Sequence, residues 1–245
     1  MSDKYRAFIV DHTAITTAGA LPEIPLRLAT EITPLWTASA EDLADAEIEP
    51  PFWAFAWAGG VGLARWVLDH PEVVRGRAVL DLGAGSGVVG IAAKKSGARQ
   101  VLAADVDPVA LVATQLNAEL NGVEVDVVGR DLLDDARVEA DVVLVGDLFY
   151  DAEVGPRVLA ALLRWTAPAD GRGVSPDGPR RDDDRGVAPP GDRPIVMVGD
   201  PGRGYLPDAT HLEAVDETEL PTSLDLESAA SKRVRVFRLR RPSAG

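Results

Sequence analysis

A glycine-rich stretch from Asp81 to Gly87, DLGAGSG, has the residue types of a ligand-binding turn. Glycines let the backbone pass close to a ligand, and the first N–H groups of a following helix can act as donors. Asp81 precedes the glycines, where a strand would end and where open parallel sheets bind ligands. A carboxylate there would repel a pyrophosphate, so the turn suits a cationic or hydroxyl-rich ligand.

Further carboxylates follow later apolar runs. Asp105 ends the run at 100–105 and could accept hydrogen bonds from both hydroxyls of a ribose. Asp107, next to Pro108, is expected to be a helix N-cap, a role that leaves Asp105 available for the ligand. Asp131 is placed to accept a hydrogen bond from an adenine amino group; the alternative is a solvated turn residue.

A second group of candidates follows the apolar run at 142–145. In the sequence GDLFYD at 146–151, Asp147 and Tyr150 could hold a cationic nitrogen by charge and by cation–π attraction. Alternatively, Asp147 caps a helix and Tyr150 is a core residue. Phe149 is expected to be buried.

Two tryptophans and one turn complete the candidates. Trp57 is expected near the ligand of the glycine turn, because glycines and the first predicted strand follow it closely. Trp53 could equally belong to the core, where aromatic side chains are more often found. Asp200 and Arg203 follow the run at 195–198 and either form a simple turn or contact the substrate.

Apolar runs that alternate with helical patterns position these residues. Strands are expected at 78–82, 100–105, 123–128, 142–145 and 195–198, and helices at 61–68, 88–96, 108–121 and 157–165. Strand alternating with helix predicts a parallel sheet. Two late strands, at 212–215 and 233–239, lack a helix between them and predict an antiparallel edge. The expected fold is α/β: a doubly wound, Rossmann-like, mostly parallel seven-stranded sheet with an antiparallel edge strand and an N-terminal extension.

One domain is expected over residues 1–245. Its first 50 residues are interpreted as the extension, with short strands at 8–10 and 24–28 and a helical turn at 41–46. Residues 167–193 contain no large apolar side chain beyond two valines. They cannot bury enough surface to offset their ordering entropy, so a disordered surface loop is predicted.

Composition excludes several kinds of site. The chain has no cysteine, which removes disulfides and thiolate chemistry, and its three histidines are too far apart for a metal-ligand spacing, so no metal is predicted. A formal net charge of −14 disfavours nucleic acids and suits a basic partner. No signal peptide or run of about 20 apolar residues is evident, so we expect a cytoplasmic protein without a membrane span, and a monomer.

The glycine turn has three possible interpretations. Gly85, Gly87 and Gly90 match the dinucleotide pattern GxGxxG, which by itself is weak. Because Asp81 and Gly83 precede those glycines, the pattern better fits the S-adenosylmethionine turn of class I methyltransferases. An unoccupied structural turn is the third interpretation.

Five segments occur in the order typical of the seven-β-strand protein lysine methyltransferases. They are PFWAFAWAGG at 51–60, the turn at 81–87, DVDP at 105–108, GDLFYD at 146–151 and GDPGR at 199–203. Over roughly residues 20–240 the chain resembles this group, most of all the electron transfer flavoprotein β-subunit lysine methyltransferase type. The resemblance implies S-adenosylmethionine as cofactor, transfer of a methyl group to a protein lysine, and the electron transfer flavoprotein β subunit as a candidate substrate.

The resemblance also assigns residues. It implies substrate contacts at Asp147 and Tyr150, which would orient the amine and stabilise charge. It implies cofactor contacts at Trp57, Gly83, Gly85, Asp105, Asp131 and Gly146; Asp81 and Gly87 are cofactor candidates from the turn itself. The chain departs from the family in the long segment 167–193 and in the charged last strand, with Arg233, Arg235 and Arg238.

Three competing functions remain open: methylation of a small amine such as a pyridine amide, an NAD-dependent reaction, and non-catalytic cofactor binding. A walled-off pocket would favour the small amine, and an open acidic groove would favour a protein.

Overall fold

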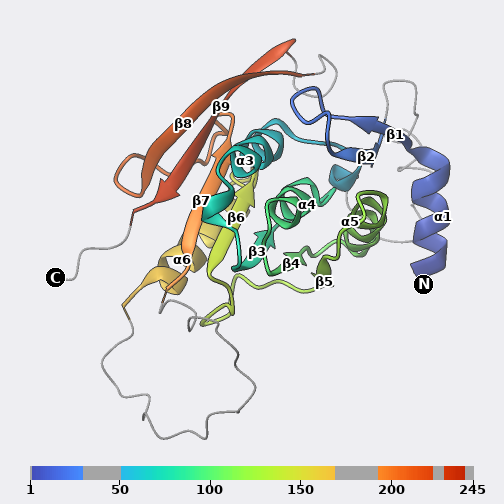
Figure 1. The fold of residues 1–245 in the computed structure, drawn as a ribbon. Helices are drawn as coiled ribbons and strands as arrows, with labels where there is room; N and C mark the ends of the chain where they lie inside the picture. Colours follow the sequence, from blue (N-terminus) through green and yellow to red (C-terminus); the bar gives the residue numbers. More distant parts are fainter. Residues whose placement is uncertain (1, 30–50, 169–192, 223–228, 241–245) are drawn as a thin grey trace, which may run out of the picture.

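The computed structural model describes residues 2–29, 51–168, 193–222 and 229–240 (Figure 1). Its centre is a sheet in the order β5-β4-β3-β6-β7-β9-β8. The strands are β3 (Ala78–Leu82), β4 (Gln100–Ala104), β5 (Asp126–Val128), β6 (Val142–Gly146), β7 (Ile195–Asp200), β8 (Leu212–Pro221) and β9 (Ser231–Leu239). Pairing is parallel from β5 to β7, whereas β9 runs antiparallel to both β7 and β8. The predicted fold class is confirmed.

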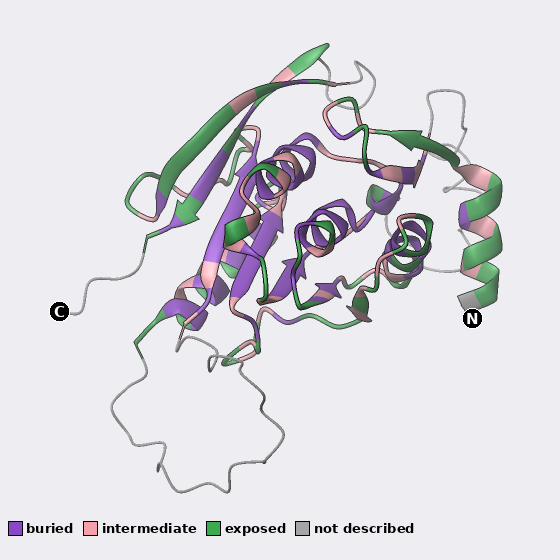
Figure 2. Cartoon of the chain, viewed as in Figure 1, coloured by how far each residue is buried: buried purple, intermediate pink, exposed green. Residues whose placement is uncertain are grey.

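Helices cover both faces of this sheet. One face packs against α3 (Ala58–Asp69), α4 (Val88–Lys95) and α5 (Pro108–Leu120). The other face packs against α6 (Val154–Thr166), which is the only helix on that face among the described residues. The central strands are therefore buried throughout, whereas β8 at the edge is mostly exposed (Figure 2). A strand covered on both faces needs apolar residues at successive positions, as in the run at 142–145.

Small residues let α3 lie directly on the carboxyl ends of β6 and β7. A Cβ atom at Gly146 would be 2.8 Å from the Gly60 Cα, and one at Gly59 would be 2.5 Å from the Gly199 carbonyl oxygen. Neither position tolerates a side chain, because the contacts are with backbone. The first turn of α3 is thus held beside the end of β6.

The N-terminal extension contains a helix and a two-stranded sheet. The predicted strand at 8–10 is wrong, because it belongs to α1 (Ser2–His12). Three apolar residues in a row fit either structure, and the helix is selected by tertiary packing: Ile9 is fully buried against α5. The small sheet pairs β1 (Ala14–Thr17) with β2 (Pro25–Leu28), close to the predicted 24–28.

Asn117 connects this extension to the glycine turn. Its Nδ2 donates to the Ser86 carbonyl oxygen at 2.8 Å, and its Oδ1 accepts from the Arg27 N–H at 2.7 Å. The side chain is fully buried. One amide on α5 therefore satisfies backbone groups of two segments far apart in the sequence.

Some expectations lie outside the described residues: the turn at 41–46, and the predicted loop at 167–193 except for its ends. Within the described ranges, no helix combines the length and the apolar composition needed to cross a bilayer.

Candidate active site

A cavity of about 470 Å³ opens at the carboxyl ends of β3, β4 and β6. The strand order reverses between β3 and β6, and open α/β sheets bind ligands at such a point. Eight of the ten predicted site residues line this cavity: Trp57, Gly83, Gly85, Asp105, Asp131, Gly146, Asp147 and Tyr150.

The other two predicted cofactor residues, Asp81 and Gly87, lie beneath the turn, outside the cavity lining. Asp81 is 1% exposed, and its Oδ2 accepts a 2.8 Å hydrogen bond from the Gly90 N–H in the first turn of α4. Burial raises the pKa of Asp81 to about 7, although that hydrogen bond acts in the opposite direction. Gly87 has a φ of +79° and precedes α4, packed on Thr114. Both residues support the turn on the side away from the cavity.

The turn faces the cavity with bare backbone. Gly83 and Gly85 have φ values of +68° and +51°, in the left-handed region that favours glycine. A Cβ at Gly83 would also lie 2.8 Å from a methyl carbon of Leu148. Side chains are excluded from these positions, and a ligand can approach the main chain closely.

Asp105 is tied to the same turn. Its Oδ2 accepts from the Gly85 N–H at 2.8 Å, and its Oδ1 accepts from the Asp107 N–H at 3.0 Å. Burial raises the pKa of Asp105, opposed by these backbone N–H groups. A carboxylate has about four acceptor positions, so room for a ribose hydroxyl remains. Asp107 accepts from the Val109 N–H at 2.8 Å, which confirms it as the N-cap of α5.

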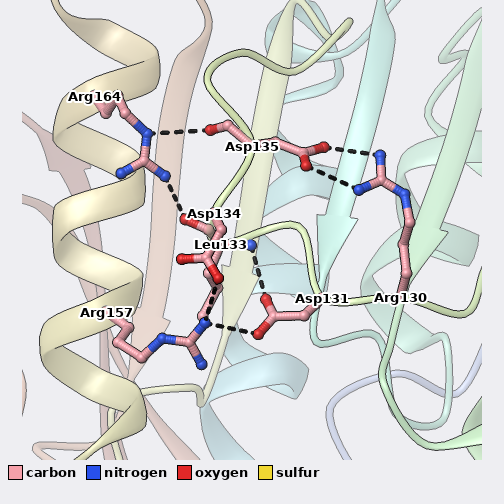
Figure 3. A network of polar contacts seen from close by, with 7 residues as sticks. All are labelled: Arg130, Asp131, Leu133, Asp134, Asp135, Arg157 and Arg164. Carbon is pink, nitrogen blue, oxygen red and sulfur yellow. Dashed lines mark hydrogen bonds and ion pairs between the residues drawn. The ribbon is translucent and has the colours of Figure 1, made fainter.

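Asp131 belongs to a network of ion pairs on one wall of the cavity (Figure 3). Its Oδ1 accepts from the Leu133 N–H, and its Oδ2 pairs with Arg157 on α6, each at 2.8 Å. Arg157 also reaches Asp134, at 3.3 Å. Burial would raise the pKa of Asp131, but the two hydrogen bonds outweigh it and lower that pKa. Asp131 is therefore held in place as a carboxylate.

Asp147 has a strained backbone and a crowded carboxylate. Its φ is +60°, the left-handed region, and its N–H donates to the Gly199 carbonyl oxygen at 2.9 Å. Oδ2 accepts from the Gly59 N–H at 2.7 Å, so Asp147 satisfies the first turn of α3. Arg203 donates to both oxygens of the carboxylate, with Nε 2.5 Å from Oδ1 and a terminal nitrogen 3.1 Å from Oδ2.

Aromatic side chains surround this ion pair. The Phe52 ring centroid is 5.6 Å from that of Tyr150 and 5.8 Å from that of Trp57. The Arg203 guanidinium carbon lies 5.7 Å from the Trp57 ring centroid, within cation–π distance. Tyr150 and Phe52 are 47% and 37% exposed, so the mouth of the cavity is open to solvent.

Asp200 builds the turn that carries Arg203. Its Oδ1 accepts from the N–H groups of Gly202 and Arg203, at 2.6 and 2.7 Å. Asp200 is 1% exposed, its Oδ2 has no hydrogen-bond partner among the described residues, and burial raises its pKa to about 6. Asp200 thus has the turn role and lies outside the cavity lining, whereas Arg203 lines the cavity.

Several lining residues were missed by sequence reasoning. Arg130 and Arg157 carry no motif, so no sequence signal marks them. Phe52 stands in the segment PFWAFAWAGG and could have been included with Trp57. Trp53 also lines the cavity while being 1% exposed, so it serves both the core and the site. Phe149 is fully buried, which confirms its predicted fate.

Chemically, the cavity has two ends. The end formed by Gly83, Gly85 and Asp105 offers backbone and carboxylate acceptors to a polyhydroxylated ligand. The end formed by Asp147, Tyr150 and Arg203 offers an ion pair and an aromatic ring to a nitrogen base. Reaction between two ligands requires such a continuous space.

Two curated relatives compared with this chain carry the same protein name. The chain is 34% identical over 236 residues to the electron transfer flavoprotein beta subunit lysine methyltransferase of Homo sapiens, covering 94% of this chain and 79% of that protein. It is 42% identical over 153 residues to the Rattus norvegicus protein of the same name, covering 62% of this chain and 59% of that protein. The matched region thus spans less than two thirds of the rat relative.

More distant similarity concerns parts of the chain. The family model for ribosomal protein L11 methyltransferase (PrmA) matches residues 66–148. A crystal structure of ribosomal protein L11 methylase from Lactobacillus delbrueckii subsp. bulgaricus superposes with a TM-score of 0.45 at 17% identity, covering 76% of this chain and 81% of that one. A superposition this loose supports no conclusion, and the fold is assigned from the strand order itself.

Proposed function

Because the chain belongs to the electron transfer flavoprotein beta subunit lysine methyltransferase family, we propose that it transfers a methyl group from S-adenosylmethionine to the side-chain amine of a protein lysine. The family membership confirms the resemblance seen in the sequence. The protein partner that we propose is the electron transfer flavoprotein β subunit, on which the relatives act by name.

The observation that carries this proposal is one cavity that joins an acceptor-rich end to a nitrogen-binding end. Gly85 and Asp105 stand at the first end, joined by a 2.8 Å hydrogen bond. Asp147 and Tyr150 stand at the second, after the neighbouring central strand β6. A methyl donor held at one end faces an amine held at the other, the arrangement that in-line transfer needs.

The residues present fit the cofactor. Positive φ at Gly83 and Gly85 leaves a cradle that a Cβ would fill, and Asp105 retains acceptor capacity for ribose hydroxyls. Asp131, held as a carboxylate, would accept from the adenine amino group. When bound, S-adenosylmethionine would supply an electrophilic methyl carbon on a sulfonium, with the thioether as its leaving group.

The residues at the amine end bind and orient the lysine. A lysine with its usual pKa near 10.4 must lose a proton before its lone pair can react. Asp147 and Tyr150 supply orientation: the carboxylate accepts an N–H, and the half-exposed ring contacts the chain of the lysine. Asp147 is already bonded to Arg203 and Gly59, so it is not a free base, and the proton passes to water.

The competing functions have less support. The open mouth at Tyr150 and Phe52 suits a protein better than a small amine. The expected acidic groove is not found: the cavity lining has mixed charge, since Arg130, Arg157 and Arg203 line it together with aspartates. A cytoplasmic location, a monomeric state and the absence of nucleic acid as partner stay predictions.

A labelled-transfer assay tests the proposal. Purified electron transfer flavoprotein β subunit is incubated with the protein and methyl-labelled S-adenosylmethionine, and nicotinamide is offered in a parallel reaction. We expect label in the β subunit, mapped by mass spectrometry to lysine. Label in nicotinamide alone would favour the small-amine reaction, NAD-induced thermal stabilisation would favour a dinucleotide enzyme, and binding of cofactor without transfer to any protein would favour a binding module.

A further inference from the structure

Arg203 and Asp147 form a two-point ion pair where the acceptor amine is proposed to bind. The Arg203 Nε is 2.5 Å from Asp147 Oδ1, and a terminal nitrogen is 3.1 Å from Oδ2. The Asp147 side chain is 5% exposed and that of Arg203 is 22% exposed. Pairs of this geometry are strong, since the planar guanidinium matches the carboxylate at both oxygens.

The carboxylate nevertheless keeps one acceptor position. Its Oδ2 accepts from Arg203 and from the Gly59 N–H, at 3.1 and 2.7 Å, and its Oδ1 accepts from Arg203 alone among the described residues. A carboxylate has about four acceptor positions, of which three are used. Asp147 can therefore accept one N–H from an amine at Oδ1 while its charge is already balanced.

Charge balance matters because only the neutral amine reacts. A bare carboxylate within hydrogen-bond distance stabilises an ammonium and raises its pKa, typically by about 1–3 units. An arginine stays protonated at every physiological pH and cancels that field. Paired with Arg203, Asp147 would direct an amine without holding it in the protonated, unreactive form.

Surrounding groups fix Arg203 in this position. Asp200, on β7, accepts its backbone N–H at 2.7 Å, and the Trp57 ring lies under its guanidinium at 5.7 Å. Among the described residues, the other acid that interacts electrostatically with Asp147 is Asp200, and the backbone of α3 contributes the positive end of a helix. Without Arg203, two carboxylates would therefore act together on the amine site.

We propose that Arg203 is a positioning residue for methyl transfer, which neutralises Asp147 so that the acceptor lysine binds at Oδ1 as a neutral amine. The inference rests on the proposed function, and it concerns the proton state of the bound lysine. Arg203 acts through Asp147 and takes no proton itself.

The test is the pH dependence of kcat for methylation of purified electron transfer flavoprotein β subunit at saturating cofactor. Four proteins are compared with wild type: Arg203→Met, Arg203→Lys, the double variant Arg203→Met with Asp147→Asn, and Arg65→Met. Arg65 is the matched control, because it pairs with Asp69 on α3 and with Glu23 in the N-terminal extension, and it lies outside the cavity lining.

Arg203→Met should move the rising limb of the profile at least one unit to higher pH, which lowers kcat at least tenfold at a pH on that limb. Arg203→Lys should keep the wild-type position, because it keeps the charge. The double variant should return the limb to the wild-type position even though its plateau is lower. Arg65→Met should match wild type in both plateau and limb.

Other outcomes separate the inference from the proposed function. A lower plateau in Arg203→Met with an unmoved limb would show a structural role only and overturn the inference, provided that calorimetry gives cofactor affinity within about threefold of wild type. If Arg203→Met does not fold, a shifted limb in Arg203→Lys, or in the double variant, would overturn it equally. A wild-type protein that labels no protein lysine would instead overturn the proposed function.

Discussion

Asp105 Oδ2 lies 2.8 Å from the backbone nitrogen of Gly85, so the carboxylate at the end of β4 holds the glycine turn at the end of β3. The two segments come from neighbouring parallel strands, whose carboxyl ends share one edge of the sheet. A single residue therefore both shapes the turn and presents acceptors to the cavity.

Asp105→Ala should weaken S-adenosylmethionine binding by about 1.5–3 kcal/mol, the usual range for hydrogen bonds to a charged acceptor. Isothermal titration calorimetry measures the loss, and NAD should give no detectable heat. Asp126→Ala, an exposed acid outside the cavity lining, is the control and should bind like wild type. Unchanged affinity in Asp105→Ala would remove this residue from the ribose site.

Asp147→Asn should lower methyl transfer by about 10²-fold or more, because the Arg203 cation would lose its counter-charge beside the amine, with cofactor affinity within about threefold of wild type. Tyr150→Phe should cost less than Tyr150→Ala, because the ring face is retained. Turnover and calorimetry are measured side by side. Equal losses of turnover and cofactor binding would place Asp147 in the cofactor site instead.

Gly146→Ala should destabilise the fold by about 1–3 kcal/mol, because the new Cβ would meet the Gly60 Cα at 2.8 Å and α3 would have to move. At this chain size that corresponds to a fall in Tm of roughly 2–12 °C. Gly204→Ala is the control, since nothing lies within 4 Å of its Cβ position and its φ is not positive. Equal Tm values would show that α3 has room at this contact.

Asp81 should make the folded state less stable as the pH rises. Burial raises its pKa to about 7, above the usual carboxyl value, so between pH of about 4 and 7 the folded chain keeps a proton that the unfolded chain has released. The free energy of unfolding then falls with increasing pH across that window. Asp200, with its pKa raised to about 6 by burial, acts in the same direction.

Asp81→Asn should therefore reduce the fall in unfolding free energy between pH 5 and pH 8, by on the order of 2 kcal/mol. Urea unfolding of cofactor-free protein at each pH gives the two slopes. The difference between slopes is informative even if the variant is less stable overall. Parallel slopes for the two proteins would mean that Asp81 ionises normally in the folded state.

Much of the fold could be predicted from the sequence, because alternation of elements is a local property. The strand at 78–82 has the predicted bounds, and α5 begins at Pro108 as predicted. The predicted strand at 8–10 failed because three apolar residues carry no period that separates strand from helix. Ile9 is buried by α5, a contact between segments about 100 residues apart that no local pattern reveals.

The sequence could predict which residues lie at the site, but not which of them contact one another. Strand ends place Asp105 and Asp147 at one edge of a parallel sheet, which the pattern alone suggests. The sequence could not predict to which face of the sheet the Asp81 side chain points. Both faces of β3 are buried, so the strand has no alternation of apolar and polar residues that would tell them apart. The Arg203–Asp147 pair joins residues 56 positions apart, and its geometry depends on the turn made by Asp200.

The buried amide of Asn117, which joins the Ser86 carbonyl to the Arg27 N–H, connects the extension at residues 2–29 directly to the glycine turn. If a ligand stiffens the turn, we expect slower hydrogen exchange at the Arg27 amide. A change in the extension that frees Asn117 would then weaken the ligand by the same coupling free energy. We therefore expect the N-terminal extension, which Figure 1 labels α1, β1 and β2, to share in setting the affinity of the cavity.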